Sequence, residues 1–70
     1  MEDFKGNLLN IGDSVIYVHY SSSSSQYLES GIVGEIKKVV GRNVAYILLP
    51  GEKTVPSYRK GVTSQNIYKV

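Results

Sequence analysis

The sequence contains no cysteine and no tryptophan, and it has a single histidine, His19. Without thiols the chain can form no disulfide, no thiolate metal site and no cysteine nucleophile, which argues against a secreted disulfide scaffold and against redox chemistry. Carboxylates are the only other strong metal ligands, and they show no EF-hand spacing. The sequence therefore predicts no metal and no cofactor.

Long hydrophobic runs are also lacking. The N-terminal residues 1–5 are polar and acidic, and no apolar stretch long enough for a signal peptide or a membrane span follows them. The expected location is thus the cytoplasm, without membrane contact. The net charge is +2, from eight Lys and Arg against six Asp and Glu, a balance that permits nucleic-acid binding without arguing for it.

The length of 70 residues leaves room for one hydrophobic core, so residues 1–70 are expected to form a single domain. Hydrophobic residues make up 41% of the chain, which is typical of a folded protein rather than a disordered one. The strand pattern begins only after residue 7, and residues 1–7 are a candidate flexible segment.

The first half of the chain predicts two strands joined by a long loop. Ser14–Tyr20 is rich in β-branched and aromatic residues and follows a Gly-Asp turn dipeptide, so it predicts the first strand. A serine tract, 21–25, begins a polar connection over Ser21–Ser30. Gly31–Val40 predicts the second strand, in which Gly34 indicates a bulge or the close approach of another backbone.

The second half predicts three further strands. Gly41–Asn43 is typical of a short hairpin connection, and the continuous apolar run Val44–Leu49 predicts a buried third strand. Thr54–Val55 predicts a short or irregular fourth strand, because the following proline lacks an N–H group. One 3₁₀ turn over Thr63–Asn66 should precede a last strand, Ile67–Val70.

Several short strands without a sustained helical pattern predict an all-β domain, and at this length a small closed barrel is favoured because closure removes exposed sheet edges. The order of elements resembles the small five-stranded SH3-like barrels, including the KOW-type group, of phage and bacterial proteins. The resemblance covers nearly the whole chain from residue 8. Five features carry it. They are the entry to the first strand (Ile11–Val15), the long loop ending near Leu28, the opening of the second strand (Gly31–Val33), the third strand (Val44–Leu49) and the closing segment (Val62–Ile67).

Catalysis is not expected. His19 lies inside a predicted strand, and the carboxylates are scattered through termini, turns and strands, so that no acid–base pair is indicated by spacing. The sequence therefore predicts a binding protein rather than an enzyme.

Two groups of cations are candidate anion-binding residues. Lys37, Lys38 and Arg42 lie at one end of the predicted second hairpin, and Arg59 and Lys60 follow Tyr58 near the fourth strand. Cations neutralise phosphates and aromatic rings stack on bases, so these six residues could bind nucleic acid. However, Glu35 and Glu52 interrupt the basic surface, and exposed lysines at hairpin tips commonly serve solubility, so an ordinary solvated surface is the favoured explanation.

The strands carry more apolar residues than the interior of one small barrel can hold. Alternation places large apolar groups on both faces of the first and third strands, which indicates burial against a second copy or another protein. A terminal segment folding across the barrel, residues 4–9, would explain the same surplus. The expected partner-binding residues are the outward strand tyrosines together with the apolar end of the long loop: Tyr17, Tyr20, Tyr27, Leu28 and Tyr46.

The sequence thus predicts a non-enzymatic interaction module that binds a protein partner or forms a homo-oligomer. The resemblance implies an accessory or regulatory protein of a phage or bacterium, one that could act on a host factor. Two alternatives remain open: a nucleic-acid binder that uses the basic hairpin, and an oligomer that sequesters a small anionic nucleotide between its subunits.

Overall fold

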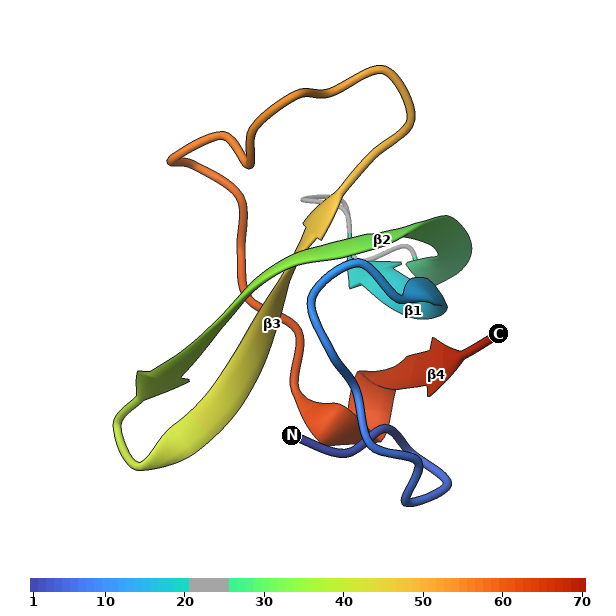
Figure 1. The fold of residues 1–70 in the computed structure, drawn as a ribbon, viewed down its shortest axis with the longest axis vertical. Coiled ribbons are helices and arrows are strands. Elements are labelled where there is room, and N and C mark those ends of the chain that lie inside the picture. Colours follow the sequence, from blue (N-terminus) through green and yellow to red (C-terminus); the bar gives the residue numbers. More distant parts are fainter. Residues whose placement is uncertain (21–25) are drawn as a thin grey trace.

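The computed structural model of the chain describes residues 1–20 and 26–70, with the side chain of Tyr20 also left out. The described part is all-β and contains one open, antiparallel, four-stranded sheet of strand order β3-β2-β1-β4 (Figure 1). The elements are β1 (Ser14–Tyr20), β2 (Gln26–Val39), β3 (Arg42–Leu48), the 3₁₀ turn η1 (Ser64–Asn66) and β4 (Ile67–Lys69). None of the described residues form a helix that is long and apolar enough to cross a membrane.

The bounds of β1 are confirmed, whereas β2 begins five residues earlier than predicted. The polar stretch Gln26–Ser30 is not a loop, because it pairs with the second half of β1, from Tyr20 opposite Gln26 to Ile16 opposite Ser30. Without this partner, the second half of β1 would leave its backbone groups on that edge unpaired. The serine tract, 21–25, lies outside the described residues.

Two glycines of β2 are fixed by close packing. Gly34 marks the predicted bulge, since the pairing with β3 shifts register between Val33 and Glu35. A Cβ atom on Gly34 would lie 3.3 Å from the backbone carbonyl oxygen of Tyr46, so the predicted close approach of another backbone is found as well, and it would lie 2.7 Å from a methyl group of Val55. Gly31 does not open the strand but lies in its middle, where a Cβ would collide with Ile47.

The β2–β3 turn is one position earlier than predicted. Val39 pairs with Arg42, which leaves Val40 and Gly41 as a two-residue connection and starts β3 at Arg42 rather than Val44. Both turn residues have positive φ, 48° and 78°, as a type I′ hairpin turn requires. The sequence did not reveal this turn because valine is rarely found at positive φ.

The predicted fourth strand is wrong, and the five-stranded closed barrel is not found. Residues 49–61, all of them described, contain no strand. Within the described residues, the backbone bridges the outer edge of β3 only between Ala45 and Val62, which exchange hydrogen bonds of 2.9 and 2.7 Å. The predicted 3₁₀ turn and last strand are confirmed as η1 and β4, and β4 pairs with β1.

Where the predicted fourth strand is missing, side chains form hydrogen bonds with backbone groups at the end of β3 and just after it. Arg59 donates from Nη1 to the carbonyl oxygen of Ile47 at 2.9 Å, and Glu52 Oε1 accepts the N–H of Leu49 at 2.7 Å. The two side chains also pair with each other, with 2.6 Å between Arg59 Nη2 and Glu52 Oε2. This Glu52–Arg59 clamp satisfies edge groups that a ladder would otherwise pair, so the sheet can remain open.

The core lies on the concave side of the sheet. Alternate residues of the strands point into it, and Leu9 from the N-terminal segment and Val62 cover it from the other side. The buried hydrophobic residues are Leu9, Val15, Tyr17, Val33, Val44, Ala45, Ile47, Val62 and Ile67. Tyr17 is therefore a core residue, and its predicted outward position is wrong.

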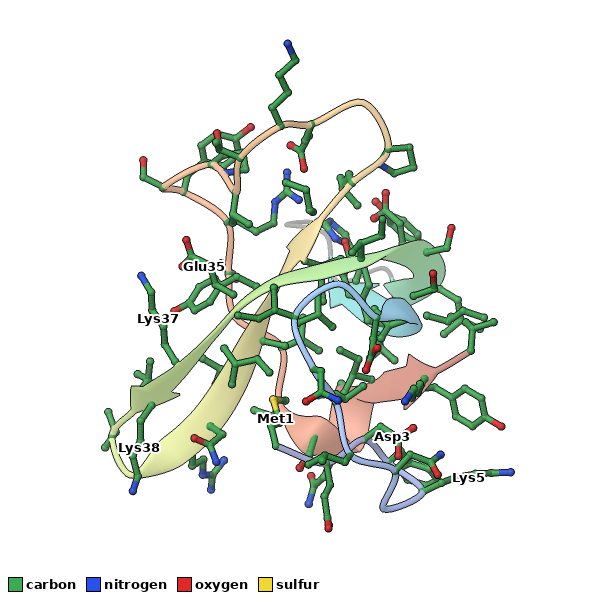
Figure 2. All side chains as sticks on the ribbon, viewed as in Figure 1. Met1, Asp3, Lys5, Glu35, Lys37 and Lys38 are labelled. Carbon is green, nitrogen blue, oxygen red and sulfur yellow. The ribbon has the colours of Figure 1, made fainter. Side chains whose placement is uncertain are left out.

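Residues 1–7, the candidate flexible segment, pack against β4. Asp3 is 4% exposed and accepts hydrogen bonds from the backbone of Lys5, Asn7 and Lys69, and also from the Asn7 amide group. Phe4 donates its N–H to the carbonyl oxygen of Ile67 at 2.9 Å. Figure 2 shows Met1, Asp3 and Lys5 along this segment, beside β4.

Candidate functional site

The convex face of the sheet carries an uncovered apolar surface. Val15 and Tyr17 of β1 face the core, so their neighbours Ile16 and Val18 point to the other side, where they are only partly buried. Val18 lies opposite Leu28 of β2, and Ile16 lies opposite Tyr68 of β4. Three strands thus contribute apolar side chains to one face.

A groove of about 340 Å³ runs across this face, and we call it the outer groove. It is lined by Phe4, Ile16, Tyr17, Val18, Leu28, Gln65, Asn66, Ile67 and Tyr68, none of which is charged. Leu28 is 70% exposed and Phe4 is 67% exposed. Lys5 lies at the rim, with its Nζ 5.3 Å from the centre of the Tyr68 ring.

The structure separates the five predicted partner-binding residues. Tyr17 and Leu28 both line the outer groove, but Tyr17 is 3% exposed and belongs to the core, whereas Leu28 is exposed; Tyr20 lies outside the described side chains. Tyr27 is half exposed on the other face, with its ring 4.9 Å from that of His19. Tyr46 lies on the β2–β3 hairpin, where the ammonium of Lys37 is 5.6 Å from its ring. As partner-binding residues, the five stay a prediction.

The sequence-based prediction of partner-binding residues did not include Phe4, Ile16, Val18 and Tyr68, which also line the outer groove. The alternation within β1 was the signal for Ile16 and Val18, but it could not say which of the two faces lies inside. That choice depends on Leu9 and Val62, which are distant in sequence and cover the opposite face.

A second cavity of about 330 Å³, the inner groove, lies between β1 and the segment 58–66. It is lined by Tyr17, Val18, His19, Tyr58, Arg59, Lys60, Gly61, Val62, Thr63 and Asn66. Burial, followed by the charge and hydrogen bond of Glu29, raises the pKa of Tyr17 to about 12. The phenol donates to Glu29 Oε2 at 3.3 Å, and His19 Nδ1 lies 3.4 Å from the same oxygen. Tyr17 therefore stays protonated and serves as a structural donor.

Arg59 is not available as a free cation. Its guanidinium is held by Glu52 in a two-pronged ion pair, and its side chain is 12% exposed. The hydrogen bond to the Glu52 carboxylate raises the pKa of Arg59 above its ordinary value, and the same bond lowers the pKa of Glu52. Of the predicted trio Tyr58, Arg59 and Lys60, the two outer members are exposed and the middle one is structural.

The other three predicted cations form a separate group at the end of the β2–β3 hairpin. Lys37 Nζ lies 3.1 Å from Glu35 Oε2, an exposed pair, and no acidic side chain in the described part of the chain pairs with Lys38 or Arg42. The hairpin end projects from one end of the molecule, whereas the segment containing residues 52–60 lies at the other (Figures 1 and 2). The two groups therefore do not form one continuous patch.

Groups of three or more potential metal ligands are absent from the described residues. In the inner groove the Tyr17 hydroxyl is engaged by Glu29, and the residues that line the outer groove are uncharged. The arrangement is suited to binding through surface complementarity.

The fold and the grooves define a small all-β domain with an open sheet and an apolar convex face. The chain belongs to the family described as Domain of unknown function (DUF7205), whose model matches residues 1–61. No curated protein and no solved structure matches it.

Proposed function

We propose that the protein is a non-enzymatic interaction module that self-associates by packing its outer groove against that of a second copy. The observation that carries this proposal is the uncharged, uncovered apolar groove built by β1, β2, β4 and Phe4. Contiguous exposed apolar surface rimmed by polar residues is typical of protein interaction sites. Burying a side chain such as Leu28 or Phe4 contributes on the order of 1.5–3 kcal/mol.

A second copy suits this surface because a C2 interface brings the same patch together from both sides. Like charges would oppose such a pairing, but none of the residues that line the groove is charged. The rim, which includes Lys5, Gln65 and Asn66, can remain hydrated at the boundary of the contact.

Pairing through the β4 edge is blocked, which favours face-to-face packing. The carbonyl oxygen of Ile67 already accepts from Phe4, and the N–H of Lys69 already donates to Asp3 Oδ2 at 2.8 Å. With these edge groups satisfied, a partner strand has few free groups to add to. Two such sheets would instead stack about 10 Å apart through their convex faces.

We also propose that the fold is an open variant of the five-stranded SH3-like barrel. The strand order, the 3₁₀ turn before the last strand and the pairing of that strand with β1 support this. The Ala45–Val62 bridge would then be the remnant of the missing strand. The accessory role in a phage or bacterium, the cytoplasmic location and nucleotide sequestration stay predictions.

Sedimentation velocity over a concentration series tests self-association. The wild type should move from monomer to dimer as concentration rises, and Leu28→Asp should remain monomeric because a carboxylate would be buried in an apolar contact. Ile11→Asp is the matched control, since Ile11 is 67% exposed and does not line the outer groove. A wild type that stays monomeric at every concentration, or equal effects of the two substitutions, would overturn the proposal.

A further inference from the structure

The end of the β2–β3 hairpin, residues 37–44, combines exposed apolar and cationic side chains, and we call it the basic hairpin end. Val40 at its tip is 98% exposed and Val39 is 43% exposed. The two are flanked by Lys37, Lys38 and Arg42, all exposed. Neither the outer groove nor the inner groove includes any of these residues.

Val40 is an unusual residue for this turn. Its φ of 48° lies in the left-handed region, where an L-residue costs roughly 1–2 kcal/mol and where asparagine or glycine is the ordinary choice. Burial of the side chain does not offset this backbone strain, because the side chain is almost fully exposed. Strain held at an exposed apolar tip is typical of a position kept for a contact outside the folded chain.

The cations are distributed on both faces of the two-stranded ribbon. Lys37 and Lys38 are consecutive in β2, so their side chains leave from opposite faces. Arg42 lies opposite Val39 across the ribbon, on the face that carries Lys37. A ribbon with cations on both faces matches a groove with a row of phosphates along each wall.

We propose that the basic hairpin end binds duplex DNA by entering the major groove, with its cations on the phosphates and Val40 against the base edges. The major groove of B-DNA is about 12 Å wide and admits a two-stranded β-ribbon. Its thymine methyl groups are apolar contacts that a valine can meet. The major groove of duplex RNA is deep and narrow, so the ribbon enters DNA in preference to RNA.

Fluorescence anisotropy with a labelled random-sequence DNA duplex tests this proposal in a salt series. Wild-type affinity should fall steeply as salt rises. The double variant K38Q/R42Q should bind at least about tenfold more weakly, and its salt slope should be smaller by about 2, since each lost phosphate contact removes about one unit. The matched control K53Q/K60Q removes the same charge from exposed lysines elsewhere and should stay close to wild type.

Several outcomes would overturn the proposal. These are no binding at the lowest salt, an equal loss in both double variants, or stronger binding to duplex RNA, polyglutamate or anionic vesicles than to the DNA duplex. Val40→Asn tests the contribution of the tip side chain independently of the cations. Asparagine tolerates the positive φ of this turn position, and the substitution should weaken binding while leaving the salt slope unchanged. Unaltered affinity in this variant would contradict the contact between Val40 and the bases.

Discussion

At the scale of single residues, Asp3 joins the two ends of the described chain. Its carboxylate accepts four hydrogen bonds, three from within residues 5–7 and one from the backbone of Lys69 in β4. Burial disfavours the charged form, but these hydrogen bonds outweigh it and lower the pKa of Asp3 from 3.8 to about 2. The ionised form is therefore bound more tightly by the folded chain than by the unfolded one.

This pKa shift predicts a pH-dependent stability. Because the folded pKa is lower than the unfolded one, the contribution of Asp3 is complete well above pH 3.8 and is lost as the pH falls toward about 2. Asp3→Asn should therefore lower the urea midpoint at pH 6, and the difference from wild type should shrink toward about pH 2. Glu2→Gln, next to it but exposed, is the control. A difference that stays constant with pH would contradict the assignment.

Val40 is the second residue that leads to a prediction of its own, because it is a β-branched residue at positive φ. Replacing it with asparagine removes the strain of a β-branched residue at positive φ. We expect Val40→Asn to raise the free energy of unfolding by about 1 kcal/mol, which corresponds to about 4–8 °C in a domain of this size. Thermal unfolding followed by circular dichroism measures this, and a variant less stable than wild type would show that the turn is not strained.

At the scale of secondary-structure elements, local patterns predicted what local chemistry determines. The β-branched run of β1, the bulge at Gly34 and the short turn before β4 were all visible in the sequence. The missing fourth strand was not, because its role is filled by side-chain hydrogen bonds between residues that are separated along the chain. The hydrophobic periodicity of a sequence does not indicate that a glutamate and an arginine, here Glu52 and Arg59, will form hydrogen bonds with backbone groups that a neighbouring strand would otherwise pair.

The Glu52–Arg59 clamp predicts an asymmetric result for two substitutions. Arg59→Ala leaves the carbonyl oxygen of Ile47 without its donor and should lower the free energy of unfolding by about 1–3 kcal/mol. Arg59→Lys keeps the charge but not the planar fork, so it should recover less than half of this loss. Lys60→Ala, exposed and adjacent, is the control. Full recovery by lysine in urea unfolding would show that charge alone holds the loop.

At the scale of the whole molecule, the sequence predicted a surplus of apolar strand surface but not which face of β1 carries it. It carried more apolar strand surface than one small interior could hold, and the structure places part of that surplus on the convex face, where Leu28 and Phe4 are exposed. Tyr17 was misassigned because either face of β1 could have been the inner one. The N-terminal segment explains part of the surplus, since Leu9 is buried in the core while Phe4 only borders the outer groove.

The central claim is that the outer groove is the contact between two copies of the chain. Backbone amide spectra recorded by NMR over a dilution series test it most directly, because they report the contact residue by residue. Self-association predicts concentration-dependent shifts in β1, in the first half of β2 and in β4, and none at the basic hairpin end. Spectra that do not change with concentration, or changes confined to residues outside these strands, would contradict the claim.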